Sequence, residues 1–363
     1  MNFNWSDWIP GRMKAGKAYV PGEQKNTRDW IKLNTNEFPF PPSHRVGEAI
    51  AEASKDIRYY PEPTGRLLRE ELARKHGVAA ESIVAFNGCD DALNCCIRGL
   101  TDPGEQVAYL NPSYSLYITL LRNHGAIGMP VEYRADFEFP LEELIACDAK
   151  MFMLTSPNAP SGRAFTPEEL LKLLAAKEAI FVIDETYADF SDWSAVEDIR
   201  DYPNLIVVRS FSKTYGLAGL RVGYAIANSG VIPTLNQIRD VYNVNRLSQA
   251  GATAALQDVD YYSTKRALLM ETKRSFADFV GNELGWKYIP SSTNFLFLYP
   301  ATRDGKIGAE AAQSLFAFLI EQHVLVRYFS NHPLVESGLR VSIGTPEEME
   351  TVKNLLKQWA LKE

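Results

Sequence analysis

The sequence predicts an α/β fold in which a large three-layer domain, built on a mostly parallel sheet, is followed by a smaller α+β domain. Three observations predict it. The chain has 363 residues, more than one average domain. Short apolar runs alternate with amphipathic helical patterns over the first two thirds of the chain. Those runs show no polar alternation, as expected for parallel strands that helices cover on both faces.

The predicted organisation has three parts. Residues 1–35 form an N-terminal arm, 36–262 the large domain and 263–363 the small domain. A proline-rich stretch at 38–42 follows the arm and is typical of a rigid extended connector. A glycine-poor helical pattern over 263–279 leads out of the large domain.

Apolar segments, each bounded by turn or helix signals, predict the strands. Those of the large domain are residues 82–86, 106–110, 151–154, 179–183, 205–208 and 222–226. Those of the small domain are residues 294–298, 324–327 and 339–343. Helices are expected from about Asp90 and Ser113. The tetrapeptide Thr-Pro-Glu-Glu, at 166–169 and again at 345–348, predicts two more helix starts, because it combines a threonine cap, a first-turn proline and a capping-box glutamate.

Composition limits the function classes. Lys and Arg number 38 against 45 Asp and Glu, a net charge of −7. This balance argues against nucleic acid or an anionic membrane as partner. No apolar run reaches the length of a membrane span, and the first residues lack a signal-peptide pattern. The cysteines form no C-x-x-C pair and the five histidines are scattered, so we expect no metal site and a reducing cytoplasm as the location.

Polar residues follow the predicted strands, at the edge where open α/β sheets bind ligands. Asp184 comes directly after the strand at 179–183, where a carboxylate either caps a turn or faces a ligand. Two hydroxyls, an arginine and a lysine follow the next strand among small residues that permit close approach. They are Ser210, Ser212, Arg221 and Lys213. Hydroxyls and arginine suit a phosphate, and the lysine amine suits a carbonyl. The Gly-x-Gly-x-x-Gly and Walker-A patterns are absent, so dinucleotide or P-loop nucleotide binding is not expected.

These segments resemble motifs of the fold-type I pyridoxal-phosphate (PLP) aminotransferases. Residues 210–224 are similar to their Schiff-base lysine motif, 156–162 to their S-P-N-N-P-T-G loop and 184–187 to their D-E-x-Y. Further segments resemble signatures of the histidinol-phosphate aminotransferase family. They are residues 19–22, 34–37, 58–61, 87–91, 243–245, 294–296, 324–327 and 339–345. The resemblance covers almost the whole chain in the right order.

The resemblance implies PLP-dependent transamination between two small molecules, L-histidinol phosphate and 2-oxoglutarate, in histidine biosynthesis. Lys213 would bind PLP covalently and then move the proton at the reacting carbon. Asp184 would pair with the ring nitrogen, so that the ring draws electrons. Asn158 and Tyr187 would hydrogen-bond the 3′-oxygen of the ring. Tyr114 would stack on the ring face.

The resemblance also implies a cup for the cofactor phosphate. The backbone N–H groups of Cys89 and Asp90, at a helix start, would point at it. Ser210, Ser212 and Arg221 would complete the cup.

The remaining implied roles concern the partner subunit and the substrate. Tyr60 would reach the cofactor phosphate of the neighbouring subunit, which makes a homodimer necessary. Arg340 would be the principal anion anchor of the substrate, with Arg327 as its partner, because guanidinium groups match phosphate and carboxylate geometry. Tyr19 and Asn36, from the arm and its end, would close over that site.

Two positions depart from the family patterns. Phe38 replaces the second Asn of N-E-N-P and is expected near the substrate channel, and Ala159 replaces the second Asn of S-P-N-N-P. Two alternatives keep the fold: an aminotransferase for aromatic amino acids and a threonine-phosphate decarboxylase. Residues 19–22 differ from the His-Gly-Gly-type opening of those decarboxylases, which favours the aminotransferase. A non-catalytic protein of the same fold is disfavoured because Lys213 and Asp184 are both present.

Overall fold

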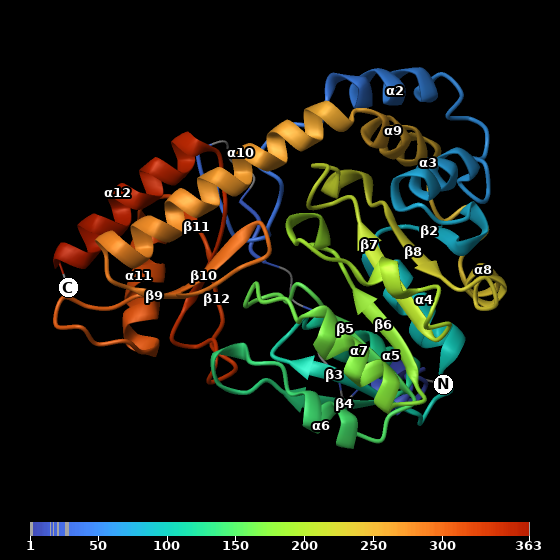
Figure 1. The fold of residues 1–363 in the computed structure, drawn as a ribbon, viewed down its shortest axis with the longest axis horizontal. Coiled ribbons are helices and arrows are strands. Elements are labelled where there is room, and N and C mark those ends of the chain that lie inside the picture. The colour runs from blue at the N-terminus through green and yellow to red at the C-terminus, as the bar shows by residue number, and fades with distance from the viewer. Residues whose placement is uncertain (1–2, 15, 17, 20–21, 26–28, 363) are drawn as a thin grey trace.

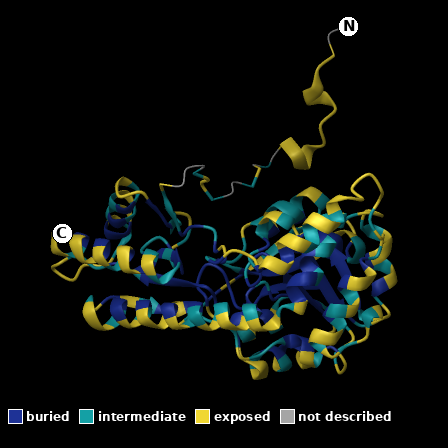
Figure 2. Cartoon of the chain, turned by 90° about the horizontal axis from the view of Figure 1, so that it is seen from above, coloured by how far each residue is buried: buried dark blue, intermediate teal, exposed yellow. Residues whose placement is uncertain are grey.

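The computed structural model describes residues 3–14, 16, 18–19, 22–25 and 29–362. Val20 and Pro21, inside one of the family-like segments, lie outside the described residues. Two bodies lie side by side and share the long helix α10 (Val259–Asp278), as Figure 1 shows. The boundary predicted at 262/263 therefore falls inside a helix. Residues 3–14, which include helix α1 (Gly11–Lys14), are exposed and project from the large body (Figure 2).

The larger body is built on a sheet that has seven strands in the described part of the chain, in the order β2-β8-β7-β6-β5-β3-β4. They are β2 (Ile83–Phe86), β3 (Gln106–Asn111), β4 (Ile127–Glu132), β5 (Met151–Thr155), β6 (Ile180–Asp184), β7 (Leu205–Ser210) and β8 (Gly223–Ala227). Only β8 runs antiparallel to its neighbours. The predicted α/β fold with a mostly parallel sheet is confirmed.

Helices cover both faces of this sheet and make three layers (Figure 1). One face packs on α4 (Cys89–Leu100), α5 (Leu116–His124) and α8 (Ile232–Ile238). The other packs on α2 (His44–Ser54), α3 (Arg66–His76), α6 (Leu141–Ala146), α7 (Pro167–Ala176) and α9 (Arg246–Gln257).

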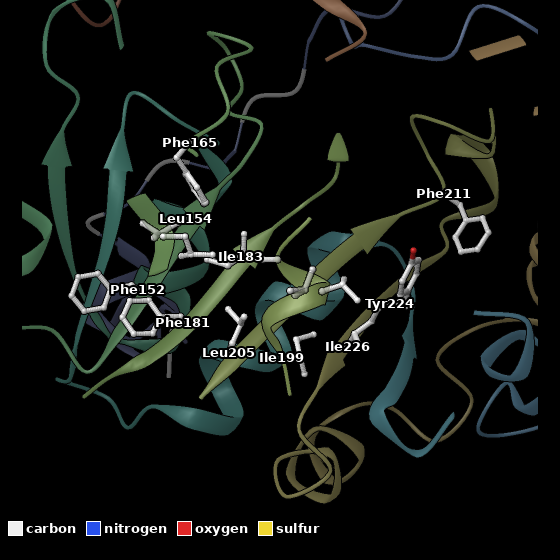
Figure 3. Close-up of a cluster of buried hydrophobic side chains, with 14 of the residues drawn as sticks. Phe152, Leu154, Phe165, Phe181, Ile183, Ile199, Leu205, Phe211, Tyr224 and Ile226 are labelled. Atoms are coloured by element: carbon white, nitrogen blue, oxygen red, sulfur yellow. The ribbon is translucent and has the colours of Figure 1, made fainter. Parts of the chain in front are cut away.

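Alternate side chains of each central strand enter two different cores. On β5, Phe152 and Leu154 belong to the cluster beneath α7, whereas Met151 and Met153 belong to the cluster beneath α4. Figure 3 shows the first cluster, in which Phe152 stacks on Phe181 of the neighbouring strand. Both faces of these strands are buried, which is why the sequence shows continuous apolar runs there.

The smaller body contains a four-stranded antiparallel sheet in the order β12-β13-β10-β9 and a parallel pair, β1-β11, within the residues described. The strands are β1 (Ile31–Lys32), β9 (Lys287–Ile289), β10 (Phe295–Tyr299), β11 (Val324–Leu325), β12 (Arg327–Tyr328) and β13 (Leu339–Ser342). Its helices are the far half of α10, α11 (Ala309–Glu321) and α12 (Pro346–Lys362). Strand β1 comes from the predicted arm, so the end of the arm joins the small body.

Local signals set several boundaries. Thr166 and Glu169 form the predicted capping box at the start of α7, since each side chain accepts from the backbone N–H of the other. Thr345 and Glu348 do the same before α12. The edge strand β4 was not predicted, because it is mostly exposed and contains Pro130. No helix of the described residues is long and apolar enough to span a bilayer.

Candidate active site

A cavity of about 230 Å³, which we call the inner cavity, lies at the C-terminal ends of β5, β6 and β7, next to the start of α4. This is the edge of the sheet at which α/β proteins bind ligands. It brings together most of the residues that the sequence predicts for the cofactor. These are Cys89, Asp90, Tyr114, Asp184, Tyr187, Ser210, Ser212, Lys213 and Arg221.

Lys213 is a half-buried amine in this cavity. Its Nζ donates a hydrogen bond to the backbone carbonyl of Thr35, at 2.7 Å. Enclosure by protein lowers the pKa of Lys213 to about 8, and the nearby Arg340 contributes in the same direction. The lowered pKa increases the fraction of this amine that is neutral near physiological pH, and the neutral amine is the form that attacks a carbonyl.

Asp184 is the last residue of β6 and is buried beneath the cavity. Its Oδ1 accepts from the backbone N–H of Thr186 at 3.1 Å and from the Cys89 thiol at 3.5 Å. Its Oδ2 accepts from the Tyr117 hydroxyl at 3.2 Å. Burial raises the pKa of Asp184, whereas these donors oppose the rise. The carboxylate is therefore oriented and suited to pair with a cation such as a protonated ring nitrogen.

Tyr117 was missed by sequence reasoning. It is fully buried on α5, and its hydroxyl oxygen is 2.6 Å from Thr155 Oγ1 as well as bonded to Asp184. It lies three residues after Tyr114, which precedes α5 and lines the cavity, and the two rings meet edge to face at 5.8 Å between their centres. Its contact with Asp184 joins residues 67 positions apart, so no local sequence pattern could have indicated it.

The start of α4 provides an anion site. No side chain caps its first turn among the described residues, so its N–H groups are free for a phosphate. Gly88, at φ +89°, allows the turn before the helix. A Cβ on Gly223 would lie 2.5 Å from the backbone nitrogen of Cys89, so β8 reaches this turn only because it has glycine there.

Two serines and Arg221 surround the same place. The backbone N–H of Ser212 donates to Ser210 Oγ at 3.1 Å. Arg221 Nη1 lies 3.5 Å from Ser212 Oγ, and its Nη2 pairs with Asp90 at 3.2 Å. Tyr114 donates to the other oxygen of Asp90 at 3.0 Å. The structure thus brings together the residues predicted for the phosphate cup, and the Asp90 carboxylate is the counter-charge that holds Arg221 in place.

Asn158 has a donor without an acceptor. The residue is fully buried, and its Oδ1 accepts from Ser161 Oγ at 2.8 Å and from Ser161 N at 3.3 Å. Its Nδ2 has no hydrogen-bond partner among the described residues. A buried polar group without a partner costs about 1–3 kcal/mol, so such groups often mark a ligand contact. This donor fits the predicted role at the 3′-oxygen of PLP, and so do the amine, carboxylate and cup.

A second cavity of about 220 Å³, the outer cavity, adjoins the inner one. Both are lined by Gln24, Thr35, Tyr114, Ala159, Tyr187 and Lys213. The outer cavity also contains all four residues predicted for the substrate, which are Tyr19, Asn36, Arg327 and Arg340. A ligand in the outer cavity can therefore reach Lys213.

Arg327 and Arg340 are direct neighbours on β12 and β13. Arg340 Nη2 donates to the carbonyl of Asn34 at 2.8 Å, and its Nε is buried without a partner among the described residues. Neither guanidinium has a carboxylate partner in the part of the chain that the structure describes. Burial and the charge of Arg327 both lower the pKa of Arg340, to about 10. Two adjacent guanidinium groups without a carboxylate have the chemistry to bind a phosphate or a carboxylate.

Three predicted positions line neither cavity: Asn158, described above, Tyr60 and Phe38. Tyr60 is 75% exposed, stacks on Tyr242 and lines neither cavity of its own chain. Phe38 also lines neither cavity; it is buried against Phe40. Ala159 lines both cavities, so its small side chain leaves space at the junction.

A buried ion network behind the site was not predicted. Arg209 Nη2 lies 2.7 Å from Glu185, and Arg209 Nη1 lies 3.2 Å from Asp189. Lys75 also pairs with Asp189, at 2.9 Å. This network joins β7 to the residues after β6 and thereby supports Asp184 and Ser210. Among the described residues, no group of His, Cys, Asp and Glu could hold a metal ion.

Comparison with known proteins gives consistent results. Residues 28–356 match the family model for aminotransferase class I and II. The histidinol-phosphate aminotransferase of Citrifermentans bemidjiense is 43% identical over 341 residues, 93% of this chain and 95% of that relative.

Two solved structures are also similar. The histidinol-phosphate aminotransferase of Sinorhizobium meliloti, solved in complex with pyridoxal-5′-phosphate, has a TM-score of 0.84 at 27% identity, over 92% of this chain and 91% of that one. The L-threonine-O-3-phosphate decarboxylase of Porphyromonas gingivalis has a TM-score of 0.75 at 26% identity, over 92% of this chain and 100% of that one.

Proposed function

The chain belongs to the aminotransferase class I and II family, and on that premise we propose that it transfers the amino group of L-histidinol phosphate to 2-oxoglutarate, with pyridoxal 5′-phosphate as cofactor. The products are imidazole-acetol phosphate and L-glutamate. This reaction is a step of histidine biosynthesis. The observation that carries the proposal is the pair Arg327 and Arg340, which lacks a carboxylate partner among the described residues and shares a cavity with Lys213. Curated histidinol-phosphate aminotransferases at 37–43% identity support it.

The residues of the inner cavity hold the cofactor and move one proton. When bound, PLP supplies the electron sink that makes the carbon bearing the amino group acidic. Lys213 Nζ would hold the cofactor covalently and, as a free amine once the substrate's amino group has taken its place, would accept the proton from that carbon. Asp184 would pair with the ring nitrogen and keep it positively charged. The cup of Ser210, Ser212 and Arg221, with the start of α4, would hold the cofactor phosphate.

The outer cavity handles two different anions in turn. The first substrate carries a phosphate and no carboxylate, whereas the second is a dicarboxylic keto acid. Arg340 and Arg327 bind the phosphate of the first and a carboxylate of the second, because both anions match the planar guanidinium fork. Tyr19, whose ring centre lies 6.3 Å from that of Tyr114, covers the cavity with Asn36 and excludes water.

A homodimer is part of this proposal. Tyr60 is exposed and stacked on Tyr242, with no role in its own chain's cavities. In a two-fold dimer it reaches the cofactor phosphate of the other subunit, and the symmetry forms both sites together. Sedimentation should give a dimer. Mixing Tyr60→Phe with Lys213→Ala subunits should restore activity, because some dimers then contain one intact site. A fully active monomer would exclude this role.

A panel of amino donors tests the reaction. The donors are histidinol phosphate, histidine, phenylalanine, tyrosine and threonine phosphate, scored by conversion of bound PLP to its amine form. Histidinol phosphate should react fastest. A preference for phenylalanine would instead identify an aromatic aminotransferase. Release of CO2 from threonine phosphate would identify a decarboxylase like the similar structure from Porphyromonas gingivalis. The cytoplasmic location stays a prediction.

A further inference from the structure

Asn36 connects the small domain to the cofactor cavity through a chain of buried hydrogen bonds. Its backbone N–H donates to Ser342 Oγ at 2.9 Å, and Ser342 Oγ donates to Asn36 Oδ1 at 2.9 Å. Its Nδ2 donates to the Tyr187 hydroxyl oxygen at 2.8 Å. All three residues are nearly inaccessible to solvent. Ser342 is on β13 of the small domain, two residues after Arg340.

Ser342 determines which way the Asn36 amide faces. A serine hydroxyl has one proton to donate. Because Ser342 Oγ accepts from the Asn36 backbone N–H, its own proton is directed at the oxygen of the amide. Turning the amide over would leave that proton without an acceptor. The nitrogen of the amide therefore faces Tyr187.

The direction of the last bond determines the direction of the Tyr187 proton. The Tyr187 oxygen accepts from Asn36, so its own proton points elsewhere. No described residue accepts it, and Tyr187 lines both cavities. If the Asn36 amide were reversed, the Tyr187 hydroxyl would donate to the amide oxygen. The hydroxyl proton would then not be available to a ligand in the cavity.

The backbone of Asn36 is held for this arrangement. Asn36 has φ +55°, in the left-handed region that asparagine tolerates better than most residues. Asn294, also from the small domain, donates to the Asn36 carbonyl at 2.9 Å. The main chain and side chain of Asn36 are thus both positioned by the small domain.

Asn158 follows the same design in the large domain. Ser161 bonds its Oδ1 and so turns its Nδ2 away, where no described residue accepts from it. The pair Ser161–Asn158 lies in the large domain, and in the second pair Ser342 of the small domain bonds Asn36. Each pair turns its amide nitrogen so that one hydrogen-bond donor is available to an acceptor in the cofactor site. Asn158 offers an amide N–H directly, and Asn36 offers one through Tyr187.

We propose that Ser342 is a positioning residue, which fixes the Asn36 amide so that the Tyr187 hydroxyl donates its proton to the 3′-oxygen of bound PLP. This rests on the proposed function only in that PLP is the cofactor. Through this chain, the position of the small domain influences the charge on the cofactor ring. Arg340 and Ser342 are on the same strand, so the segment that binds the substrate anion also controls Tyr187.

Ser342→Ala tests the proposal through the pH dependence of the visible absorbance of bound PLP, without any turnover. A donor to the 3′-oxygen stabilises the negative charge left there when the neighbouring nitrogen loses its proton. Losing that donor should therefore raise the pH midpoint of the absorbance change, by about one pH unit. Ser342→Thr, which keeps a hydroxyl, should stay near the wild-type midpoint.

The Tyr187→Phe background separates this role from a merely structural one. If Ser342 acts through the Tyr187 hydroxyl, Ser342→Ala should add no shift to Tyr187→Phe. An equal shift in both backgrounds, or no shift in the wild-type background, would overturn the proposal. Thr101→Val is the matched control. It removes a buried hydroxyl that donates to Ile97 at 2.7 Å, at the opposite end of α4 from the cavity, and should leave the midpoint unchanged.

A second variant covers the case in which Ser342→Ala does not fold. Asn36→Asp replaces the amide donor by a carboxylate that only accepts, and aspartate also tolerates the left-handed backbone. The shift of the pH midpoint that the new charge causes by itself is measured in the Tyr187→Phe background and subtracted. A remaining upward shift supports the proposal, whereas the absence of any remaining shift overturns it. Wild-type protein that takes up no PLP would refute the proposed function and this role together. PLP binding with the wrong amino donor would refute the proposed substrate alone.

Discussion

The inner and outer cavities differ in how their charges are paired. In the inner cavity Asp184 has three hydrogen-bond donors, and Arg221 is paired with Asp90. In the outer cavity Arg327 and Arg340 lie side by side without a carboxylate, and one nitrogen of Arg340 has no partner among the described residues. The inner cavity is thus organised in advance for a group that stays. The outer cavity is completed by anions that come and go.

This difference has an energetic meaning. Repulsion between two partly buried guanidinium groups raises the free energy of the unliganded protein, and a phosphate or carboxylate relieves it on binding. Charges that are already paired within the protein gain less binding free energy from a ligand, but they hold the ligand in a fixed geometry. We expect substitutions in the inner cavity to affect the reaction step, and substitutions in the outer cavity to affect the choice of substrate.

Lys213→Ala should have the largest effect, because the covalent anchor and the proton carrier are lost together. Transamination should fall by at least on the order of 10⁴-fold. Borohydride should fix PLP to Lys213 in the wild type, as shown by peptide mapping. Lys273 is an internal control, since its pKa is also lowered by burial to about 8 but it lines neither cavity. A label on Lys273 would contradict the assignment.

Asp184→Asn should have the next largest effect. The amide cannot stabilise a positive ring nitrogen, so kcat should fall on the order of 10²- to 10³-fold. Binding of PLP should persist, because the cup and Lys213 remain, and its visible absorbance checks this. Turnover near the wild-type value would remove Asp184 from the mechanism.

Arg340→Ala and Arg327→Ala should change selectivity rather than chemistry. Each removes a charged donor from a desolvated phosphate, which should lower kcat/KM for histidinol phosphate about 30- to 1000-fold. Unphosphorylated histidinol should be affected far less, and the PLP absorbance should stay intact. Arg134→Ala, at a surface pair with Glu142 and Glu143, is the control and should change neither. Equal losses for both amino alcohols would mean that the arginines do not bind the phosphate.

The smallest effect concerns the stability of the cofactor-free protein. The pKa of Lys213 is about 8 in the fold, below its ordinary value of 10.5. Between these two pH values the unfolded chain binds more protons, so stability should rise with pH through this window. Relative to Lys213→Met, wild-type protein should gain of the order of 1 kcal/mol from pH 8 to 10.5. Denaturant unfolding of both apo-proteins measures it. If the free energy of unfolding changed with pH in the same way in both proteins, the Lys213 amine would not be desolvated in the fold.

Sequence patterns predicted the parts of the fold that local rules determine. The central strands β5 and β7 are buried on both faces, so their apolar runs were visible. Thr166 and Thr345 mark helix starts through contacts only three residues away. The edge strand β4 was missed because it is exposed along most of its length and buries little apolar surface.

The site residues also fall into those that local motifs predicted and those that depend on distant contacts. Lys213, Asp184 and the cup come from short motifs next to strand ends, and the structure gathers them in one cavity. Tyr117 and Ser342 were not predicted. Their roles depend on hydrogen bonds between residues 67 and 306 positions apart, respectively, which no local pattern reports. Tyr60 was assigned from resemblance alone, and a single chain leaves it on the surface.

The shared helix α10 has a mechanical consequence. Its first turns contribute Tyr262 to the large core, and its later turns contribute Leu269 and Phe276 to the small core (Figure 1). The helix has 20 residues. At 1.5 Å per residue it is a lever about 30 Å long, whose far end moves roughly 2.6 Å for each 5° of tilt. That displacement is nearly the length of a hydrogen bond. Because the small domain also carries Arg327 and Arg340, we expect a tilt of α10 by a few degrees to change the distance between these arginines and a substrate held at Lys213.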